Sequence, residues 1–231
     1  MPEHRVFERP ACEQSLVETR HGPARLLRSP GQHPPAQHPW ATLVLGHGAG
    51  GGADARDLGW LAHDLPASGI GVIRVEQPWR VAGRKVASRA AELDESWADA
   101  LAHLPEAACL VVGGRSSGAR VACRTATSVG AVACLALAFP LHPPWRPEQS
   151  RLLELQESGV PTLVVQGERD PFGAPKDFPA LPDTIRIALV EDADHEFAVR
   201  RGSGTTTART RTDLVGCVLA WLRETAPARS A

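Results

Sequence analysis

The apolar residues of this chain form short uninterrupted runs that alternate with longer segments in which apolar residues recur every three or four positions. Uninterrupted runs are typical of strands buried on both faces, and the longer spacing is typical of amphipathic helices. The predicted strands are residues 42–45, 71–75, 110–113, 131–139, 162–165 and 185–190. The predicted helices are residues 54–67, 87–104, 119–129, 148–158 and 213–224. This alternation predicts an α/β fold, with a mostly parallel sheet that carries helices on both faces.

The two ends of the chain follow a different pattern. Residues 1–40 combine short β-prone pieces with a loop rich in Pro, Gln and His, and we expect an antiparallel leading edge there. The β-prone pieces are Val6-Phe7, Leu16-Val17 and Leu26-Leu27. Residues 200–212 are rich in Arg, Thr, Ser and Gly and predict a mobile loop, and residues 225–231 predict a frayed tail.

Composition narrows the class of protein. With 231 residues, of which 43% are hydrophobic, the chain can bury one core, and we expect a single domain over residues 1–231. A net charge of -1 gives no attraction to nucleic acid. No apolar run approaches the roughly 18–20 residues of a membrane helix, and the first residues lack the apolar stretch of a signal peptide, so we expect no membrane partner.

The spacing of the cysteines indicates the cellular compartment, and the spacing of the histidines bears on whether the protein binds a metal ion. The five cysteines are scattered singly, without a C-x-x-C pair, which favours a reducing, cytoplasmic location. The histidines form neither H-x-x-x-H nor H-E-x-x-H. We therefore expect neither a metal nor a cofactor. The oligomeric state has no signature in the sequence.

One segment carries a specific chemical signal. The predicted strand 110–113 runs into Gly114-Arg115-Ser116-Ser117-Gly118, a G-x-S-x-G sequence that precedes a predicted helix. Such a nucleophile elbow holds its serine on a sharp strand-to-helix turn, and the residues two before and two after the serine must be small. Gly114 and Gly118 meet this requirement for Ser116. A nucleophile at Ser117 would instead need a small residue at Arg115, so Ser116 is the candidate.

A serine nucleophile needs a base and an orienting carboxylate. Asp170 follows the strand 162–165, and His195 follows the strand 185–190. The chain order Ser116, Asp170, His195 resembles the order of nucleophile, acid and base in the α/β-hydrolases. Asp192 and Asp194 are alternative partners of the histidine, although Asp194 adjoins His195 and would have difficulty reaching its far ring nitrogen. We predict Ser116, His195 and Asp170 as nucleophile, base and orienting acid.

Acyl transfer also needs hydrogen-bond donors for the oxyanion that forms on the carbonyl oxygen. The glycine-rich loop 46–52 follows the strand 42–45, at the place where a hydrolase of this class supplies one backbone NH. We predict an oxyanion hole formed by the backbone NH groups of Ala49 and Ser117.

Together these motifs resemble those of the serine α/β-hydrolases. The pairing of HGAGG with GGRSSGAR is more specifically similar to small α/β-hydrolase-like proteins related to a subunit of the NSL chromatin complex and to a testis-expressed protein. The resemblance covers about residues 43–222. It implies an eight-stranded sheet with flanking helices, and it implies Ser116, Asp170 and His195 as the catalytic triad.

The substrate is less sharply indicated than the chemistry. Only residues 141–150 occupy the place where lidded hydrolases insert a helical segment, so we expect a minimal lid, an open site, and small soluble esters, thioesters or related acyl compounds as substrates. Five residues are candidates for contact with substrate: His47, Arg80, Arg115, His142 and Trp145. Arg115 favours an acidic substrate, and the alternative is that Arg115 pairs with Glu76 on a neighbouring strand.

Two rival functions remain open from the sequence. Residues Gly46 to Gly51 also read as G-x-G-x-x-G after a strand, and the next strand ends at Glu76, where a dinucleotide-binding fold would hold a ribose. The second rival is a non-catalytic binding protein that keeps the hydrolase fold. Labelling of Ser116 by a fluorophosphonate separates the hydrolase from both.

Overall fold

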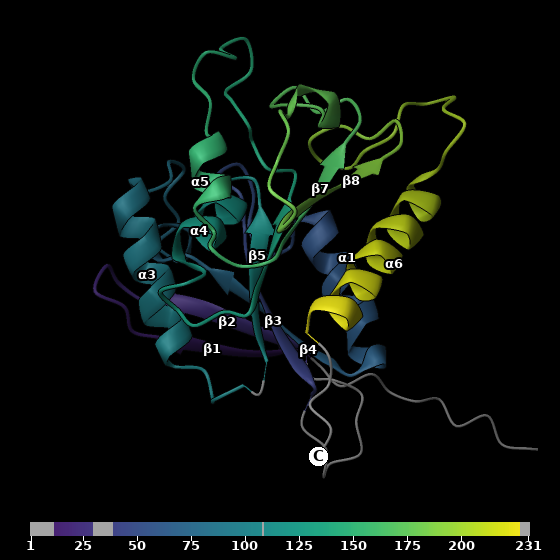
Figure 1. Cartoon of the computed structure of the whole chain (residues 1–231). Helices are drawn as coiled ribbons and strands as arrows, with labels where there is room; N and C mark the ends of the chain where they lie inside the picture. The colour runs from purple at the N-terminus through teal and green to yellow at the C-terminus, as the bar shows by residue number, and fades with distance from the viewer. Residues whose placement is uncertain (1–11, 30–38, 108, 227–231) are drawn as a thin grey trace, which may run out of the picture.

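The structure is a computed structural model that describes residues 12–29, 39–107 and 109–226. This part of the chain forms an eight-stranded sheet in the order β1-β2-β4-β3-β5-β6-β7-β8 (Figure 1). The strands are β1 (Glu13–Val17), β2 (Ala24–Ser29), β3 (Ala41–Gly46), β4 (Ile70–Glu76), β5 (Leu110–Arg115), β6 (Ala133–Leu137), β7 (Thr162–Gly167) and β8 (Ile185–Val190). Strands β3 to β8 are parallel, as the alternating pattern predicts.

Helices cover both faces of the sheet. The helices are α1 (Arg56–Asp64), α2 (Pro78–Val81), α3 (Ala90–Ala102), α4 (Ser117–Thr125), α5 (Leu152–Gln156) and α6 (Thr207–Thr225), with short 3-10 turns at Leu65–Ser68 and Pro175–Asp177. Figure 1 shows α1 and α6 on one side of the sheet and α3, α4 and α5 on the other. None of these described helices is long and apolar enough to cross a membrane.

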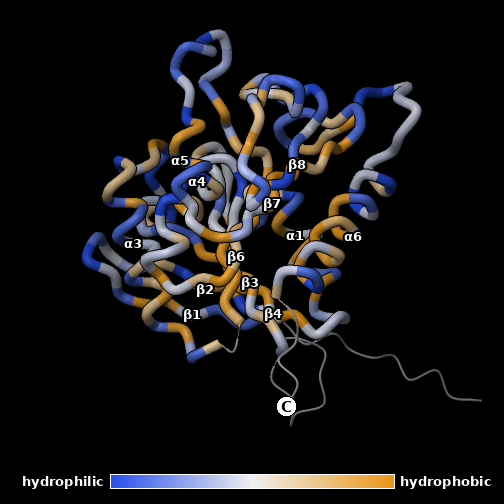
Figure 2. The backbone as a smooth tube through the Cα atoms, viewed as in Figure 1, coloured by the Kyte–Doolittle hydropathy of each residue, from blue (hydrophilic) through white to orange (hydrophobic). Residues whose placement is uncertain are grey.

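The sequence of β6 does not alternate between apolar and polar residues, and the packing of the strand explains why. Successive side chains of a strand point to opposite faces. Leu135 and Leu137 pack into the core under α1 and α6, whereas Cys134 and Ala136 pack into the core under α3 and α4. Both faces are covered, so every position is apolar. Figure 2 shows the same apolar colouring along the central strands.

The leading edge is antiparallel, as predicted. β1 pairs with β2 and β2 pairs with β4, and the second register places Arg25 opposite Glu76. The predicted strand piece at Val6-Phe7 lies outside the described residues.

Three predicted elements differ from the structure. The predicted loop 77–86 contains α2, because Pro78 at its first turn needs no backbone hydrogen-bond partner and is favoured there. The helix predicted over 148–158 shortens to α5, five residues long. The closing helix begins at Thr207 rather than at Asp213, because the Thr206 side chain accepts a hydrogen bond from the Arg209 NH and caps it. The second half of the predicted loop 200–212 is therefore helical.

The parallel strands bring distant parts of the chain to one edge of the sheet. The carboxyl ends of β3, β5, β7 and β8 all lie at this edge, which in an open α/β sheet is where ligands bind. The segments that follow these four strands carry the predicted triad and the predicted oxyanion donors.

Candidate active site

The turn between β5 and α4 has the geometry of a nucleophile elbow. Ser116 is the residue between strand and helix, with φ 52° and ψ -114°, in a region of backbone conformation that non-glycine residues rarely adopt. A Cβ on Gly114 would lie 2.5 Å from the Gly46 carbonyl oxygen, and a Cβ on Gly118 would also overlap Gly46. The two glycines therefore let β3 and α4 approach each other, and the Ser116 side chain points out over the sheet edge.

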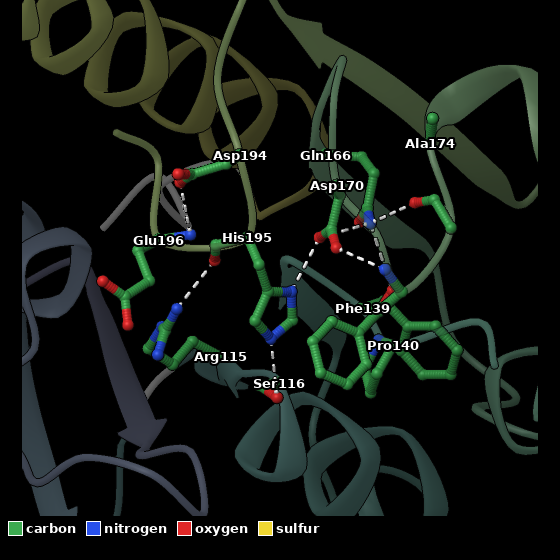
Figure 3. Close-up of polar contacts among 12 residues, drawn as sticks. Arg115, Ser116, Phe139, Pro140, Gln166, Asp170, Ala174, Asp194, His195 and Glu196 are labelled. Carbon is green, nitrogen blue, oxygen red and sulfur yellow. Dashed lines mark hydrogen bonds and ion pairs between the residues drawn. The ribbon is translucent and has the colours of Figure 1, made fainter. Parts of the chain in front are cut away.

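Ser116, His195 and Asp170 form a continuous chain of hydrogen bonds (Figure 3). The His195 Nε2 lies 3.0 Å from the Ser116 Oγ, and the His195 Nδ1 lies 2.8 Å from an Asp170 carboxylate oxygen. Asp170 is 3% exposed, whereas Ser116 and His195 are half-buried and reach the cavity. The structure thus brings together the three residues that the sequence separated by up to 79 positions.

Asp170 is held by two further donors. The Phe172 backbone NH donates to Oδ1 at 2.8 Å, and the Gln166 side-chain amide donates to Oδ2 at 2.9 Å. The same Gln166 nitrogen also lies 2.6 Å from the Gly173 carbonyl and 3.2 Å from the Phe139 carbonyl. Gln166 was not singled out from the sequence, although a buried polar residue at the end of an apolar strand is the signal that identifies it.

His195 is positioned by its neighbours as well as by Asp170. The Phe172 ring packs against the imidazole, with ring centroids 4.2 Å apart. The Arg115 Nη2 donates to the His195 carbonyl oxygen at 2.7 Å, and the Arg115 Nε donates to Asp57 at 3.2 Å (Figure 3 shows the first contact). Arg115 therefore joins the elbow to the histidine loop and to the start of α1.

The partner of Arg115 differs from the one that the sequence suggested. Glu76 is bound by Arg25, its cross-strand neighbour, at 2.5 Å. Arg115 pairs with Asp57, and both side chains are at least nine-tenths buried. The hypothesis of an Arg115–Glu76 pair is wrong, because β2 already supplies a cation to Glu76.

The alternative carboxylates near His195 have other partners. Asp194 accepts hydrogen bonds from the backbone NH groups of Glu196 and Ala198, both at 2.9 Å, and so closes its own turn. Asp192 pairs with Arg169 at 2.7 Å. Asp170 is the carboxylate that contacts the imidazole.

The predicted oxyanion donors lie beside Ser116. Ala49 and Ser117 both line the cavity. Ser117 is the first residue of α4, so its NH has no carbonyl one turn earlier to bond within the helix. Ala49 and Ser117 thus lie in the wall of the same cavity as Ser116, and their role as oxyanion donors stays a prediction.

His47 braces the glycine loop. Its Nδ1 lies 2.8 Å from the Gly48 carbonyl, and its Nε2 accepts a hydrogen bond from the Gln77 NH at 3.1 Å. Because Nε2 accepts, Nδ1 carries the proton and the ring is neutral. Burial lowers the pKa of His47 and favours this neutral form.

A cavity of about 740 Å³ lies over Ser116. Of the five candidate substrate-binding residues, Arg115 alone lines it. His47 lies beneath the glycine loop, Trp145 is 92% exposed, and neither Arg80 nor His142 lines the cavity. The wall contains four arginines that the sequence analysis did not select: Arg56, Arg120, Arg124 and Arg151.

The cavity has no helical cover. Residues 138–151, all of which the structure describes, connect β6 to α5 through turns and bends. Residues 141–150 of this segment occupy the place where lidded hydrolases insert a helical segment. They leave the cavity open, as the sequence predicted.

A family model described as an alpha/beta hydrolase domain matches residues 39–223. The chain belongs to the α/β-hydrolase family. No curated protein matches the sequence. The match includes the elbow, Asp170 and His195, and it weighs against the dinucleotide-binding alternative. In the structure, Glu76, the residue that alternative needs for a ribose, is bound to Arg25.

Solved structures agree on the fold. An α/β serine hydrolase without a lid from Xanthomonas campestris is 20% identical, with a TM-score of 0.70 over 96% of this chain and 98% of that chain. An α/β serine hydrolase homologue from Coxiella burnetii is 16% identical, with a TM-score of 0.71 over 90% and 98%. The esterase domain of a Rhodothermus marinus protein is 14% identical, with a TM-score of 0.63 over 93% and 99%. The α/β-hydrolase fold is therefore shared at low sequence identity.

Proposed function

We propose that this protein is a serine hydrolase, carboxylesterase-like, that cleaves small esters, thioesters or related acyl compounds through an acyl-enzyme on Ser116. The observation that carries the proposal is the hydrogen-bonded chain from Ser116 through His195 to Asp170 at the mouth of an open cavity. Family membership supports hydrolysis in general, and the esterase domain among the structural neighbours supports the choice of esters.

Acylation of Ser116 begins with transfer of its hydroxyl proton to the His195 Nε2, 3.0 Å away, as the Ser116 Oγ attacks the substrate carbonyl. The imidazolium that forms keeps its Nδ1 proton and donates a hydrogen bond through it to Asp170, whose negative charge stabilises the imidazolium. The negative charge on the carbonyl oxygen is stabilised by the NH groups of Ala49 and Ser117. His195 then protonates the leaving alcohol or thiol as the carbon–oxygen or carbon–sulfur bond breaks.

Deacylation uses the same groups with water as nucleophile. His195 takes a proton from water, the hydroxide attacks the Ser116 ester, and the proton returns to the Ser116 oxygen as the acid leaves. The open cavity admits this water directly, which suits hydrolysis rather than acyl transfer to a second bound substrate.

Labelling with a fluorophosphonate probe tests the proposal. The modified residue is mapped by mass spectrometry in the wild type and in Ser116→Ala, Asp170→Asn and His195→Ala, and hydrolysis of a p-nitrophenyl ester is measured in parallel. We expect label on Ser116 in the wild type and none there in Ser116→Ala. We expect His195→Ala to lower kcat by at least 10³-fold, because loss of a triad member removes most of the covalent mechanism.

A second outcome points to a different function. A non-catalytic binding protein that keeps the hydrolase fold is the alternative that the sequence left open. No label on Ser116 and no ester turnover, in protein that is folded by circular dichroism, would overturn the hydrolase proposal in favour of that alternative.

A further inference from the structure

The cavity extends away from Ser116 along one face of α4. Residues four apart on a helix lie on the same face, one turn of about 5.4 Å further along the axis. Arg120 and Arg124 follow Ser116 at this spacing, and all three residues line the cavity. A substrate with its carbonyl at Ser116 therefore has guanidinium groups beside it within one to two helical turns.

Two of these arginines are already paired with carboxylates. Arg120 donates two hydrogen bonds to Glu154, at 2.9 and 2.6 Å. Arg124 donates two to Asp94, at 2.8 and 2.6 Å, and also contacts Glu154. Their charges are thus balanced by two acidic side chains from α3 and α5.

The third arginine lacks such a partner. Arg151 precedes α5 and lines the same wall of the cavity. Among the described residues, its guanidinium has one hydrogen bond, a long one of 3.3 Å to the Pro140 carbonyl. It forms no ion pair with any residue that the structure describes. Burial and the nearby Arg120 charge lower the pKa of Arg151, and the charge of Glu154, which is not in ion-pair contact with it, offsets part of this effect. This wall therefore carries three guanidinium groups against two carboxylates, and the uncompensated charge is at Arg151.

The rest of the cavity does not offset this charge at close range. Asp57 is bound by Arg115, and the other acidic lining residues, Asp54 and Glu196, are exposed. The remaining lining cation, Arg56 at the start of α1, is exposed as well. A half-buried guanidinium with free N–H donors facing a cavity is a site for a planar oxyanion, which it can bind through two parallel hydrogen bonds.

We propose that the cavity selects substrates that carry a carboxylate a few bonds from the scissile carbonyl, and that Arg151, flanked by Arg120, binds this carboxylate. This inference rests on the proposed hydrolase function and names its substrate class. The residues differ from those that suggested an acidic substrate in the sequence, since Arg115 is occupied by Asp57 and the His195 carbonyl.

Matched pairs of esters test the proposal. Mono-p-nitrophenyl glutarate and p-nitrophenyl pentanoate have acyl chains of equal length and differ in the terminal carboxylate, and the succinate and adipate monoesters vary the reach. A carboxylate on the alcohol side is tested by the acetate esters of 3-hydroxybenzoate and of phenol. The quantity compared is the ratio of kcat/KM for the anionic and the neutral ester.

We expect the wild type to favour the anionic member of at least one pair. We expect Arg151→Gln to lower kcat/KM for that ester by about 10- to 100-fold, mainly through KM, the loss typical of one hydrogen bond to a charged group. The neutral ester changes less than about twofold. Arg151→Lys restores part of the preference, because an ammonium keeps the charge but not the paired donors. Arg186→Gln is the control, since Arg186 is 61% exposed and begins β8 at the opposite sheet edge.

Two results overturn the inference. One is an anionic-to-neutral ratio that Arg151→Gln leaves unchanged in every pair, and the other is a wild type that prefers the neutral esters throughout. If no ester is hydrolysed, the hydrolase proposal fails, and calorimetric titration of monomethyl glutarate against methyl pentanoate still tests the site. Binding of the anion that is lost in Arg151→Gln then supports the site without catalysis, and equal or absent binding overturns it.

Discussion

Arg115 and Arg151 line the same cavity, but they differ in burial and in partners. Arg115 lies at the elbow, is 8% exposed, and uses its donors on Asp57 and on the His195 carbonyl. Arg151 lies just before α5 and is half-buried, and its guanidinium has a single long hydrogen bond, to the Pro140 carbonyl. A buried arginine that is bound to a carboxylate and to a carbonyl holds the site together, whereas a half-buried arginine that lines a cavity without an ion pair is available to a ligand. Both residues are arginines near Ser116, so the difference between their roles follows from their burial and their partners rather than from residue type or position.

The largest effect on stability is expected for the buried arginine, Arg115. Arg115→Met leaves the Asp57 carboxylate buried without its cation, which lowers the free energy of unfolding by about 3–5 kcal/mol. The measurement is urea unfolding at neutral pH. Replacing both partners, in Arg115→Met with Asp57→Leu, removes the buried charge and should recover most of that stability.

The double variant also separates stability from positioning. It still lacks the donor to the His195 carbonyl, so we expect kcat to stay below the wild-type value while stability returns. Arg186→Met, which breaks the exposed pair with Glu224, is the control and should cost less than about 1 kcal/mol. A double variant as unstable as Arg115→Met alone would contradict the role assigned to the pair.

The pH dependence of stability reports on another buried group, His47. Because its pKa in the folded protein is lowered, the folded and unfolded states bind equal numbers of protons well above the unfolded pKa of about 6.5. Below that pH the unfolded chain takes up a proton that folded His47 resists. Stability therefore falls with decreasing pH, by up to about 1.4 kcal/mol per pH unit, until the folded pKa is reached.

His47→Asn isolates this contribution. Asn keeps a donor for the Gly48 carbonyl and cannot be protonated in this range. We expect the difference in unfolding free energy between pH 7.5 and pH 5.5 to be smaller in His47→Asn than in the wild type, as measured by urea unfolding at both pH values. An identical pH dependence in the two proteins would assign the effect to other groups.

The smallest effect is expected at Arg151. Arg151→Gln removes a guanidinium that forms no ion pair with a described carboxylate, and for which the repulsion from Arg120 opposes the attraction to Glu154. The free energy of unfolding should therefore change by no more than about 0.5 kcal/mol. Thermal and urea unfolding measure this. A loss above 1 kcal/mol would show that Arg151 supports the fold and would weaken the contrast with Arg115.

The order of strands and helices could be predicted from the sequence, because the spacing of apolar residues within each segment indicates whether that segment is a strand or a helix. The elbow was accessible for a different reason, since a sharp turn between strand and helix requires small residues at fixed spacing, and Gly114 and Gly118 supply them. Element ends were less accessible. The composition of residues 200–212 is that of a loop, yet the Thr206 cap starts α6 at Thr207.

The sequence by itself determined the elements, their order, and the three residues that meet at the sheet edge, because each follows a parallel strand and parallel strands end together. Which polar side chains pair across that edge was decided by tertiary structure alone. Arg25 reaches Glu76 through the register of β2 on β4, which leaves Arg115 to Asp57, and Gln166 reaches Asp170 because the loop after β7 turns back over the strand end. Such contacts depend on distances between elements, and spacing along the chain carries no record of those distances.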